Sequence, residues 1–405
     1  MLTVDNAFAG SVNAIKTICV MITRITFERG KQLKVPKVLV TGGAGFIGSH
    51  LVDALVERGH YVRVLDSLLP QVHGNRPPDY LNPAAGLIRG DICDPTVVAR
   101  ALDGIDTVFH QAAEVGVGQS MYEIQRYVRA NDFGTAVLLE GIVQRRNQVK
   151  KLVVASSMSI YGEGSYSCSN CGRVFPQLRQ VGQLLKRRWE LDCLSCGDQL
   201  SPSPTPEDKP LSPNSVYAIT KQDQEQLCLV IGQAYGIPTV ALRYFNVYGT
   251  RQALSNPYTG VCAIFSSRLL NDERPLIFED GEQTRDLVHV SDIVQANLLA
   301  LSTDRADYLP VNVGTGTATS IRQIADLLSA GIGRSLEPLI VEKYREGDIR
   351  HCVADISRAR NLLGYEPTVR LEQGIFDLVA WVRTQSANDQ ATMATAELEA
   401  RQLVR

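Results

Sequence analysis

Residues 38–48 read VLVTGGAGFIG, and this short stretch gives the first expectation for the chain. A β-branched run leads into the motif G-x-x-G-x-x-G of Gly42, Gly45 and Gly48, and residues 50–58 then carry apolar side chains at helical spacing. Glycine permits the tight turn and lets the backbone approach a pyrophosphate, which the N-terminus of the next helix also attracts. The pattern therefore predicts a dinucleotide site that contains Gly42, Gly45, Phe46, Ile47 and Gly48. A tight turn without a ligand is the alternative.

The acid at the end of the second predicted strand indicates which dinucleotide binds. Asp66 stands eighteen residues after Gly48. A carboxylate there accepts both hydroxyls of the adenosine ribose and repels a 2′-phosphate, and no arginine follows it in residues 67–69. We therefore expect NAD rather than NADP. Asp91 and Ile92, after the third predicted strand, are expected near the adenine, although a plain surface turn explains this pair nearly as well.

Short apolar runs alternate with helical segments along the first two thirds of the chain. The runs lie at 38–40, 61–65, 86–88, 107–110, 152–155 and 239–242, and the helical segments lie at 50–58, 96–102, 127–145 and 217–235. Strands without polar alternation are buried on both faces. The order therefore predicts an α/β protein with a Rossmann-type, doubly wound parallel sheet, followed by a smaller C-terminal α/β lobe that binds the substrate.

Changes in this pattern give the expected parts of the chain. These are an N-terminal extension (1–36), a dinucleotide-binding domain (37–250) to which 284–312 returns, an insert within it (164–207), a lobe that covers most of 251–384, and a tail (385–405). The tail has helix propensity, but its sequence gives little sign of tertiary packing.

The composition excludes several classes of protein. The 405 residues are 44% hydrophobic and 21% charged, with a mean hydropathy of −0.05, as in globular proteins. The net charge of −2 gives no general attraction for a nucleic acid or an anionic membrane. The chain also has no run of ~18 apolar residues, the length that a membrane-spanning helix needs. Nine cysteines, four of them in two CxxC pairs, indicate a reducing compartment. We expect a cytoplasmic protein without a nucleic-acid or membrane partner.

The insert carries cysteines with the spacing of metal ligands. Cys168 and Cys171 form one CxxC pair, Cys193 and Cys196 form the other, and a glycine follows each pair. Four thiolates close a tetrahedral Zn²⁺ shell without an open position, so we expect a structural zinc ribbon. Two redox pairs are the alternative. We expect the insert to border the sugar pocket or a subunit contact.

Zinc ribbons elsewhere bind nucleic acid, so a non-catalytic regulator that combines a Rossmann fold with a zinc ribbon is the rival function. Residues 164–207 hold five Lys or Arg against four acids. This balance is a poor match for a phosphate backbone, and it disfavours the regulator.

Tyr217 and Lys221 lie four residues apart, on one face of a predicted helix. A free tyrosine has a pKa of about 10, and a lysine one turn away, together with a positive nicotinamide, stabilises the phenolate. Ser157 ends a predicted strand and can hold a substrate hydroxyl beside the phenol. We expect these three residues to be catalytic, with Tyr217 and Lys221 also touching the cofactor. An ordinary pair on a helix surface is the alternative.

Further motifs give the chain a specific resemblance to a known family. They are TGGAGFIG (41–48), FHQAAEVGVGQS (109–120), Asn131, SSMSIYG (156–162), YAITK (217–221) and RYFNVYG (243–249). Together they resemble the extended short-chain dehydrogenase/reductases, in particular the nucleotide-sugar epimerase/dehydratase branch, over residues 37–382. The resemblance implies a tightly held, recycled NAD surrounded by the serine, the tyrosine and the lysine, with Gln111 on the cofactor side and Asn131 as the family's structural or cofactor-side asparagine.

The same resemblance implies how the substrate binds. A nucleotide-diphosphate sugar is expected to contact Ser157, Asn246, Arg285, Arg345 and Asp348, because the later motifs RYFNVYG, QTRDLVHV and REGDIRH match family positions at the nucleotide diphosphate. An arginine fork binds a pyrophosphate with two parallel hydrogen bonds. A homodimer formed through helices of the Rossmann domain is also implied.

The residues just before Tyr161 distinguish the reactions of this branch. The 4,6-dehydratases carry Thr-Asp-Glu there, whereas this chain has Ser157-Met158-Ser159 and so lacks the carboxylates that elimination needs. We expect an isomerase, a 4-epimerase that oxidises C4 transiently and returns the hydride to the opposite face. The motifs SSMSIYGEG and RQALSNPYTGV are similar to those of dTDP-L-rhamnose 4-epimerases, which form dTDP-6-deoxy-L-talose. A UDP-glucose or UDP-hexosamine 4-epimerase is the alternative, and then a 4,6-dehydratase.

Overall fold

The computed structural model describes residues 35–74 and 76–405. Residues 36–405 form one compact unit. The expected N-terminal extension, 1–36, lies almost entirely outside the described residues. In the described part of the chain, no helix combines the length and the apolar character that a membrane crossing requires.

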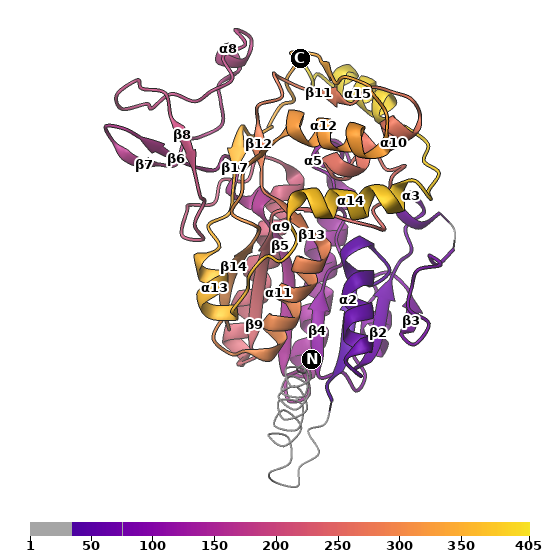
Figure 1. Cartoon of the computed structure of the whole chain (residues 1–405). Coiled ribbons are helices and arrows are strands. Elements are labelled where there is room, and N and C mark those ends of the chain that lie inside the picture. The colour runs from indigo at the N-terminus through magenta and orange to yellow at the C-terminus, as the bar shows by residue number, and fades with distance from the viewer. Residues whose placement is uncertain (1–34, 75) are drawn as a thin grey trace, which may run out of the picture. The chain divides into compact units, whose positions relative to one another are not determined.

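A seven-stranded sheet forms the centre of this unit (Figure 1). Its strands are β1 (Lys37–Thr41), β2 (Tyr61–Asp66), β3 (Gly86–Arg89), β4 (Thr107–His110), β5 (Lys151–Ser157), β9 (Thr239–Tyr244) and β14 (Leu309–Val313). They lie in the order β14-β9-β5-β4-β1-β2-β3, and every neighbouring pair is parallel. The chain starts near the middle, winds to one edge and then to the other. The predicted Rossmann-type parallel sheet is confirmed.

Helices cover both faces of the sheet. One face carries α2 (Phe46–Glu57), α11 (Val290–Ser302) and α13 (Ser357–Leu363), and the other carries α4 (Pro95–Ala101), α7 (Gly134–Gln144) and α9 (Val216–Tyr235). Strand β1 shows the reason for the apolar runs, since Val38 and Val40 join the core on the α2 side while Leu39 joins the core on the other side. Both faces of a central strand are therefore buried.

The chain after residue 250 contributes to the sheet and also builds a lobe above it. Helix α11 packs on the sheet, and β14 extends the sheet beside β9. The lobe is built around α10 (Val261–Leu270), α12 (Ile321–Ile332) and α14 (Leu371–Val382), whose apolar sides form a separate core. Its small sheets contain β10 (Asn246–Tyr248), β11 (Leu276–Ile277), β12 (Thr284–Arg285), β13 (Leu287–His289), β15 (Thr319–Ser320), β16 (Leu339–Ile340) and β17 (His351–Cys352).

Short helices connect these larger elements. They are α3 (Pro70–His73), α5 (Val117–Ser120), α6 (Ile124–Tyr127), η1 (Val128–Phe133), which continues into α7, and η2 (Met158–Tyr161).

The cysteine-rich insert has its own small sheet. Strands β6 (Ser165–Cys168), β7 (Gly172–Val174) and β8 (Ser201–Ser203) pair antiparallel, and α8 (Val181–Leu184) lies between the last two along the chain (Figure 1). The core of the insert consists of Tyr166, Cys168, Leu191, Cys193 and Leu200. Few apolar side chains are available, so these cysteines make up a large share of what holds the module together.

The C-terminal tail has a defined place, which the sequence did not indicate. Helix α15 (Ala391–Ala400) buries Ala391, Ala394 and Leu398. Beyond the helix, Val404 forms an antiparallel bridge with Arg345. The weak sequence signal has a physical reason, since the buried side of α15 consists mostly of alanines, whose pattern differs little from that of an exposed helix.

Candidate active site

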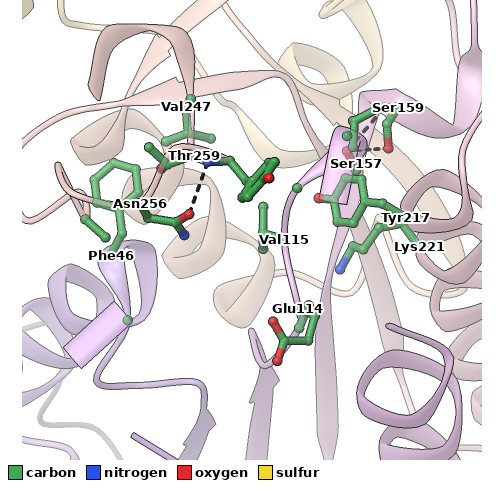
Figure 2. Close-up of a pocket in the computed structure, with 18 of the residues that line it drawn as sticks. Phe46, Glu114, Val115, Ser157, Ser159, Tyr217, Lys221, Val247, Asn256 and Thr259 are labelled. Atoms are coloured by element: carbon green, nitrogen blue, oxygen red, sulfur yellow. Dashed lines mark hydrogen bonds between the residues drawn. The ribbon is translucent and has the colours of Figure 1, made fainter. Parts of the chain in front are cut away.

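One cavity of about 1110 Å³ runs along the carboxyl ends of the parallel strands and continues under the C-terminal lobe (Figure 2). Ligands of open α/β sheets bind at this edge. The cavity is larger than the range of about 300–1,000 Å³ that is usual for a single small-molecule site. It therefore has room for a dinucleotide and a second ligand together.

The cavity gathers nearly all the site residues expected from the sequence. It is lined by Gly42, Gly45, Phe46, Ile47, Gly48, Asp66, Asp91, Ile92, Gln111, Ser157, Tyr217, Lys221, Asn246, Arg285, Arg345 and Asp348. Of the expected cofactor and substrate residues, Asn131 alone does not line it.

The glycine turn between β1 and α2 has the close approach that a dinucleotide site needs. Gly42 has a φ of +68°, and a Cβ atom there would lie 2.8 Å from the backbone of Ala112. A Cβ atom on Gly48 would lie 2.2 Å from the carbonyl oxygen of Gly42. Gly45 begins α2 without a side-chain cap, so the first-turn N–H groups stay available to an anion. The turn therefore fits the pyrophosphate of a dinucleotide.

Asp66 ends β2 at the edge of this turn, where its carboxylate is largely buried. The backbone N–H of Ala44 donates to Oδ2 at 3.0 Å, and the N–H of Leu68 donates to Oδ1 at 2.9 Å. A carboxylate has about four acceptor positions, so two remain for a ribose diol. The two backbone bonds hold the carboxylate in place, which fits an NAD ribose.

Tyr217 and Lys221 project into the cavity from the first turns of α9, beside Ser157 at the end of β5 (Figure 2). Ser215 caps this helix by accepting a hydrogen bond from the N–H of Ala218. Burial lowers the pKa of Lys221 to about 8. Burial raises the pKa of Tyr217, and a hydrogen bond with Ser157 opposes this change. The phenol therefore depends on its neighbours to reach the phenolate state at neutral pH.

The hydroxyl of Ser157 has a fixed role in this group. Its oxygen accepts from the N–H of Ser159 at 3.2 Å and from the hydroxyl of Ser159 at 2.9 Å (Figure 2). With both acceptor positions engaged, the proton of Ser157 is directed away from Ser159, toward Tyr217 or a substrate oxygen. Met158 and Ser159 also line the cavity, and neither offers a carboxylate for an elimination.

Asn131 has a structural role in place of a cavity position. Its side chain is fully buried, accepts from the N–H of Glu114 at 2.7 Å, and donates to the carbonyl of Glu114 at 3.1 Å. It also donates to the hydroxyl of Thr220 at 2.9 Å. The amide thus joins the loop after β4 to the helix of Tyr217. This geometry fits the structural one of the two roles that the resemblance implies for Asn131, because the amide is enclosed by protein.

The part of the cavity where the expected substrate residues lie holds two arginines and a buried acceptor. The guanidinium of Arg285 donates to the carbonyls of Ile349 and Arg350 at 2.8 and 3.0 Å. Arg345 pairs with Asp348 at 2.8 Å. Among the described residues, Asn246 Oδ1 is buried without a hydrogen-bond partner, and Asn246 lines the cavity. These groups match the donors and acceptors that a nucleotide diphosphate needs.

Several cavity residues were not found from the sequence. Glu114 lines the cavity beside Val115 (Figure 2) and forms an ion pair with Arg126 at 2.8 Å. Asn256 also lines the cavity and accepts from the side-chain amide of Gln71 at 3.1 Å. Glu114 belongs to the motif at 109–120 that contributed to the family resemblance, so this motif could have predicted its place at the cavity. The other contacts depend on chain segments that are distant in sequence.

The tail also lines the cavity. Ala391, Ala394, Thr395 and Leu398 of α15 form part of its wall. Glu397, on the same helix, accepts from the hydroxyls of Tyr122 and Tyr258 at 3.0 and 2.9 Å. These bonds hold α15 against the loops that surround the site.

Comparisons with known proteins agree with this geometry. The family model described as "NAD dependent epimerase/dehydratase family" matches residues 38–174 and 195–314. The dTDP-L-rhamnose 4-epimerase of Burkholderia thailandensis is 35% identical over 350 residues, which cover 85% of this chain and 94% of that protein.

Two solved structures are similar to this chain over most of its length. The UDP-glucose 4-epimerase of Thermotoga maritima with UDP-glucose has a TM-score of 0.70 at 35% identity, covering 86% of this chain and 98% of that one. The UDP-glucuronic acid 4-epimerase of Bacillus cereus, in complex with UDP-glucuronic acid and NAD, has a TM-score of 0.70 at 31% identity, with 86% and 99% covered.

Proposed function

Because the chain belongs to the NAD-dependent epimerase/dehydratase family, we propose that it is a nucleotide-sugar 4-epimerase that uses a tightly held NAD. One observation carries the proposal. Tyr217, Lys221 and Ser157 line the same cavity as the glycine turn, while positions 158 and 159 provide no acid for a dehydration. The same residues disfavour a non-catalytic regulator, since a binding module does not need a buried lysine beside a half-buried tyrosine.

The residues present would perform the proton chemistry of the epimerisation. NAD, when bound, supplies the acceptor and then the donor of the hydride at C4. Tyr217, as the phenolate, accepts the proton of the 4-hydroxyl and later returns it. Lys221 stabilises the phenolate by its positive charge, and Ser157 orients the reacting oxygen by its directed proton. The sugar must turn over in the cavity between the two half-reactions, so that its opposite face meets the cofactor.

The proposed substrate is dTDP-L-rhamnose, converted to dTDP-6-deoxy-L-talose. The 35% identity to the B. thailandensis enzyme supports this choice. A UDP-glucose or UDP-hexosamine 4-epimerase is the second candidate, supported by the equal identity to the T. maritima structure. The deciding experiment incubates the protein separately with dTDP-L-rhamnose, UDP-glucose, UDP-N-acetylglucosamine and dTDP-glucose, and identifies the sugars by NMR. Failure to turn over any of them would refute the epimerase, and a 4-keto-6-deoxy product from dTDP-glucose would indicate a dehydratase.

We also propose that the four cysteines of the insert hold a structural Zn²⁺. The sulfur atoms of Cys168, Cys171, Cys193 and Cys196 lie within 4.8 Å of one another. Tetrahedral zinc with bonds of about 2.3 Å places its sulfurs about 3.8 Å apart, so the set needs little rearrangement. Four thiolates leave no position for a substrate, which fits a structural ion. Elemental analysis should find one zinc per chain, and C168S should lose it. An unchanged zinc content in C168S would contradict the site.

The homodimer implied by the resemblance remains part of the proposal. Exposed apolar side chains lie on α6, η1 and α9, three helices that contact one another. They are Ile124, Val128, Phe133, Ile219, Leu227 and Val230. An apolar set of this kind on adjacent helices is typical of a subunit contact. Light scattering should give the mass of a dimer for the native protein and that of a monomer for V230E, whereas a native monomer would refute the dimer.

A further inference from the structure

A buried cluster of ion pairs connects the cysteine-rich insert to the lobe. Arg179 of the insert makes two hydrogen bonds to the carboxylate of Glu279, both at 2.8 Å. Glu190 of the insert accepts from Arg350 at 2.8 Å and contacts His351 at 3.2 Å. Arg350 also pairs with Glu279 at 3.1 Å, so the two halves form one continuous network.

The cluster is enclosed by protein to an unusual degree. The side chains of Arg179, Glu279 and Arg350 are only 1%, 2% and 1% exposed. Burial raises the pKa of Glu190, but hydrogen bonds from His351 and Arg350 outweigh that effect and bring it to about 2. Buried charges persist only when they are paired and fully hydrogen-bonded. Arg350 pairs with Asp280 as well, so removal of Arg179 or Glu190 leaves each remaining charge a partner but changes the charge balance of the buried network, and its side chains must rearrange.

The segment that this cluster holds is the one that carries substrate-binding groups. The guanidinium of Arg179 donates to the carbonyl of Asp348 at 3.1 Å. The carbonyls of Ile349 and Arg350 in turn hold the guanidinium of Arg285. The positions of Asp348 and Arg285 thus depend on where residues 348–351 lie.

The insert acts on this segment from behind the cavity. No residue of 164–207 lines the cavity, although the structure describes all of this range, so the insert does not border the sugar pocket in the way one alternative predicted. It is joined to the segment through the backbone. The N–H of Gly164 donates to the carbonyl of His351, and Thr205 forms a parallel bridge with Ala354. These contacts of the insert therefore lead to the segment that carries Asp348 and holds Arg285.

We propose that Arg179 and Glu190 are positioning residues, through which the insert fixes residues 348–351 so that Arg285 and Asp348 are preset to hold the nucleotide diphosphate. This inference rests on the proposed function. It assigns to the insert a part in substrate affinity, in addition to its own folding.

The test measures affinity for the diphosphate part of the substrate on the full-length, NAD-loaded protein. Calorimetry gives the Kd of dTDP and of UDP for the native protein and for R179M, E190Q and R188Q. Arg188 is the matched control, since it lies in the same insert but forms an exposed pair with Asp192. For whichever nucleotide the native protein binds, R179M and E190Q should raise the Kd at least ~10-fold, whereas R188Q should leave it unchanged.

Two further readouts separate positioning from general damage. The bound NAD and kcat should stay within about twofold of the native values in both cluster variants, while KM rises with the Kd. Unchanged affinity in folded R179M and E190Q would overturn the inference, and so would an equal loss in R188Q. If R179M does not fold, E190Q decides, because Glu190 is one third exposed.

The outcome for the proposed function is read separately. A native protein that binds dTDP or UDP but turns over no nucleotide sugar would refute the epimerase, while the Kd ratios would still decide the role of the insert. A native protein that binds neither nucleotide would overturn the inference itself.

Discussion

The side-chain amine of Lys221 donates a hydrogen bond to the backbone oxygen of Ala155. Ala155 lies in β5 two residues before Ser157, whereas Lys221 lies on α9 one turn after Tyr217. This one bond therefore ties the helix of Tyr217 to the strand of Ser157, the proposed catalytic tyrosine and serine. Lys221 has both a structural and an electrostatic part in the site, and the two can be separated experimentally.

The electrostatic part predicts a change in the pH profile. Burial lowers the pKa of Lys221 to about 8, so its charge is present below that pH and lost above it. In K221M the charge is absent at every pH, and the pKa of Tyr217 should rise further. The rising limb of kcat against pH should move up by roughly 1–3 pH units. K150M removes an exposed lysine and is the control. A lowered kcat with an unmoved profile would mean that Lys221 acts through structure alone.

Removal of the phenol hydroxyl tests the proposed acid and base. Y217F should bind NAD as the native protein does, because the ring and the helix stay in place, but kcat should fall about 10²–10⁴-fold. Y235F changes an exposed tyrosine on the same helix and should keep full activity. The measurement is epimerisation followed by NMR, with NAD released by denaturation and quantified. Native turnover by Y217F would end the proposed mechanism.

Asn131 should matter for stability before it matters for chemistry. In N131A the N–H and the carbonyl of Glu114 lose their side-chain partner in a buried place. Each such group costs about 1–3 kcal/mol, so the free energy of unfolding from urea titration should fall by at least ~1 kcal/mol. N147A, at an exposed position, should change it by less than about 0.5 kcal/mol. Equal stability of N131A and the native protein would show that the Asn131 amide does not hold the loop after β4 against α9.

The tail helix should contribute to substrate affinity. Leu398 is 7% exposed and forms part of the cavity wall. L398A should loosen α15, so that hydrogen exchange speeds up in residues 391–405 and KM for the nucleotide sugar rises, by about tenfold for each 1.4 kcal/mol lost. M393A changes a side chain that is 64% exposed on the same helix and should do neither. Unchanged exchange in L398A would mean that other contacts alone hold the tail.

Local patterns were enough to predict the sheet and the cofactor end of the site. The turn from Gly42 to Gly48 joins a strand and a helix within eleven residues, and the position of Asp66 follows from the next strand. Tyr217 and Lys221 share a helix face by spacing alone. These inferences hold because turn chemistry and periodicity act over a few neighbours along the chain.

The remaining features depend on residues that only folding brings together. Asn131 could be assigned to a site from its motif, but its partners Glu114 and Thr220 become visible only when α9 packs on η1. In the sequence, Arg179 and Glu190 cannot be told from solvent-exposed charges. In the folded chain they pair with Glu279 and Arg350, and Arg179 becomes buried.

The amino-acid sequence established the Rossmann-type sheet, the glycine turn, the expected catalytic trio and the paired cysteines, because each has a short-range signature. The place of the tail at the cavity, the structural role of Asn131 and the ion cluster behind residues 348–351 came from the folded chain. Alanines at a wall and charges in a buried network have no distinctive local pattern. Their meaning comes from burial, which is a property of the packed molecule.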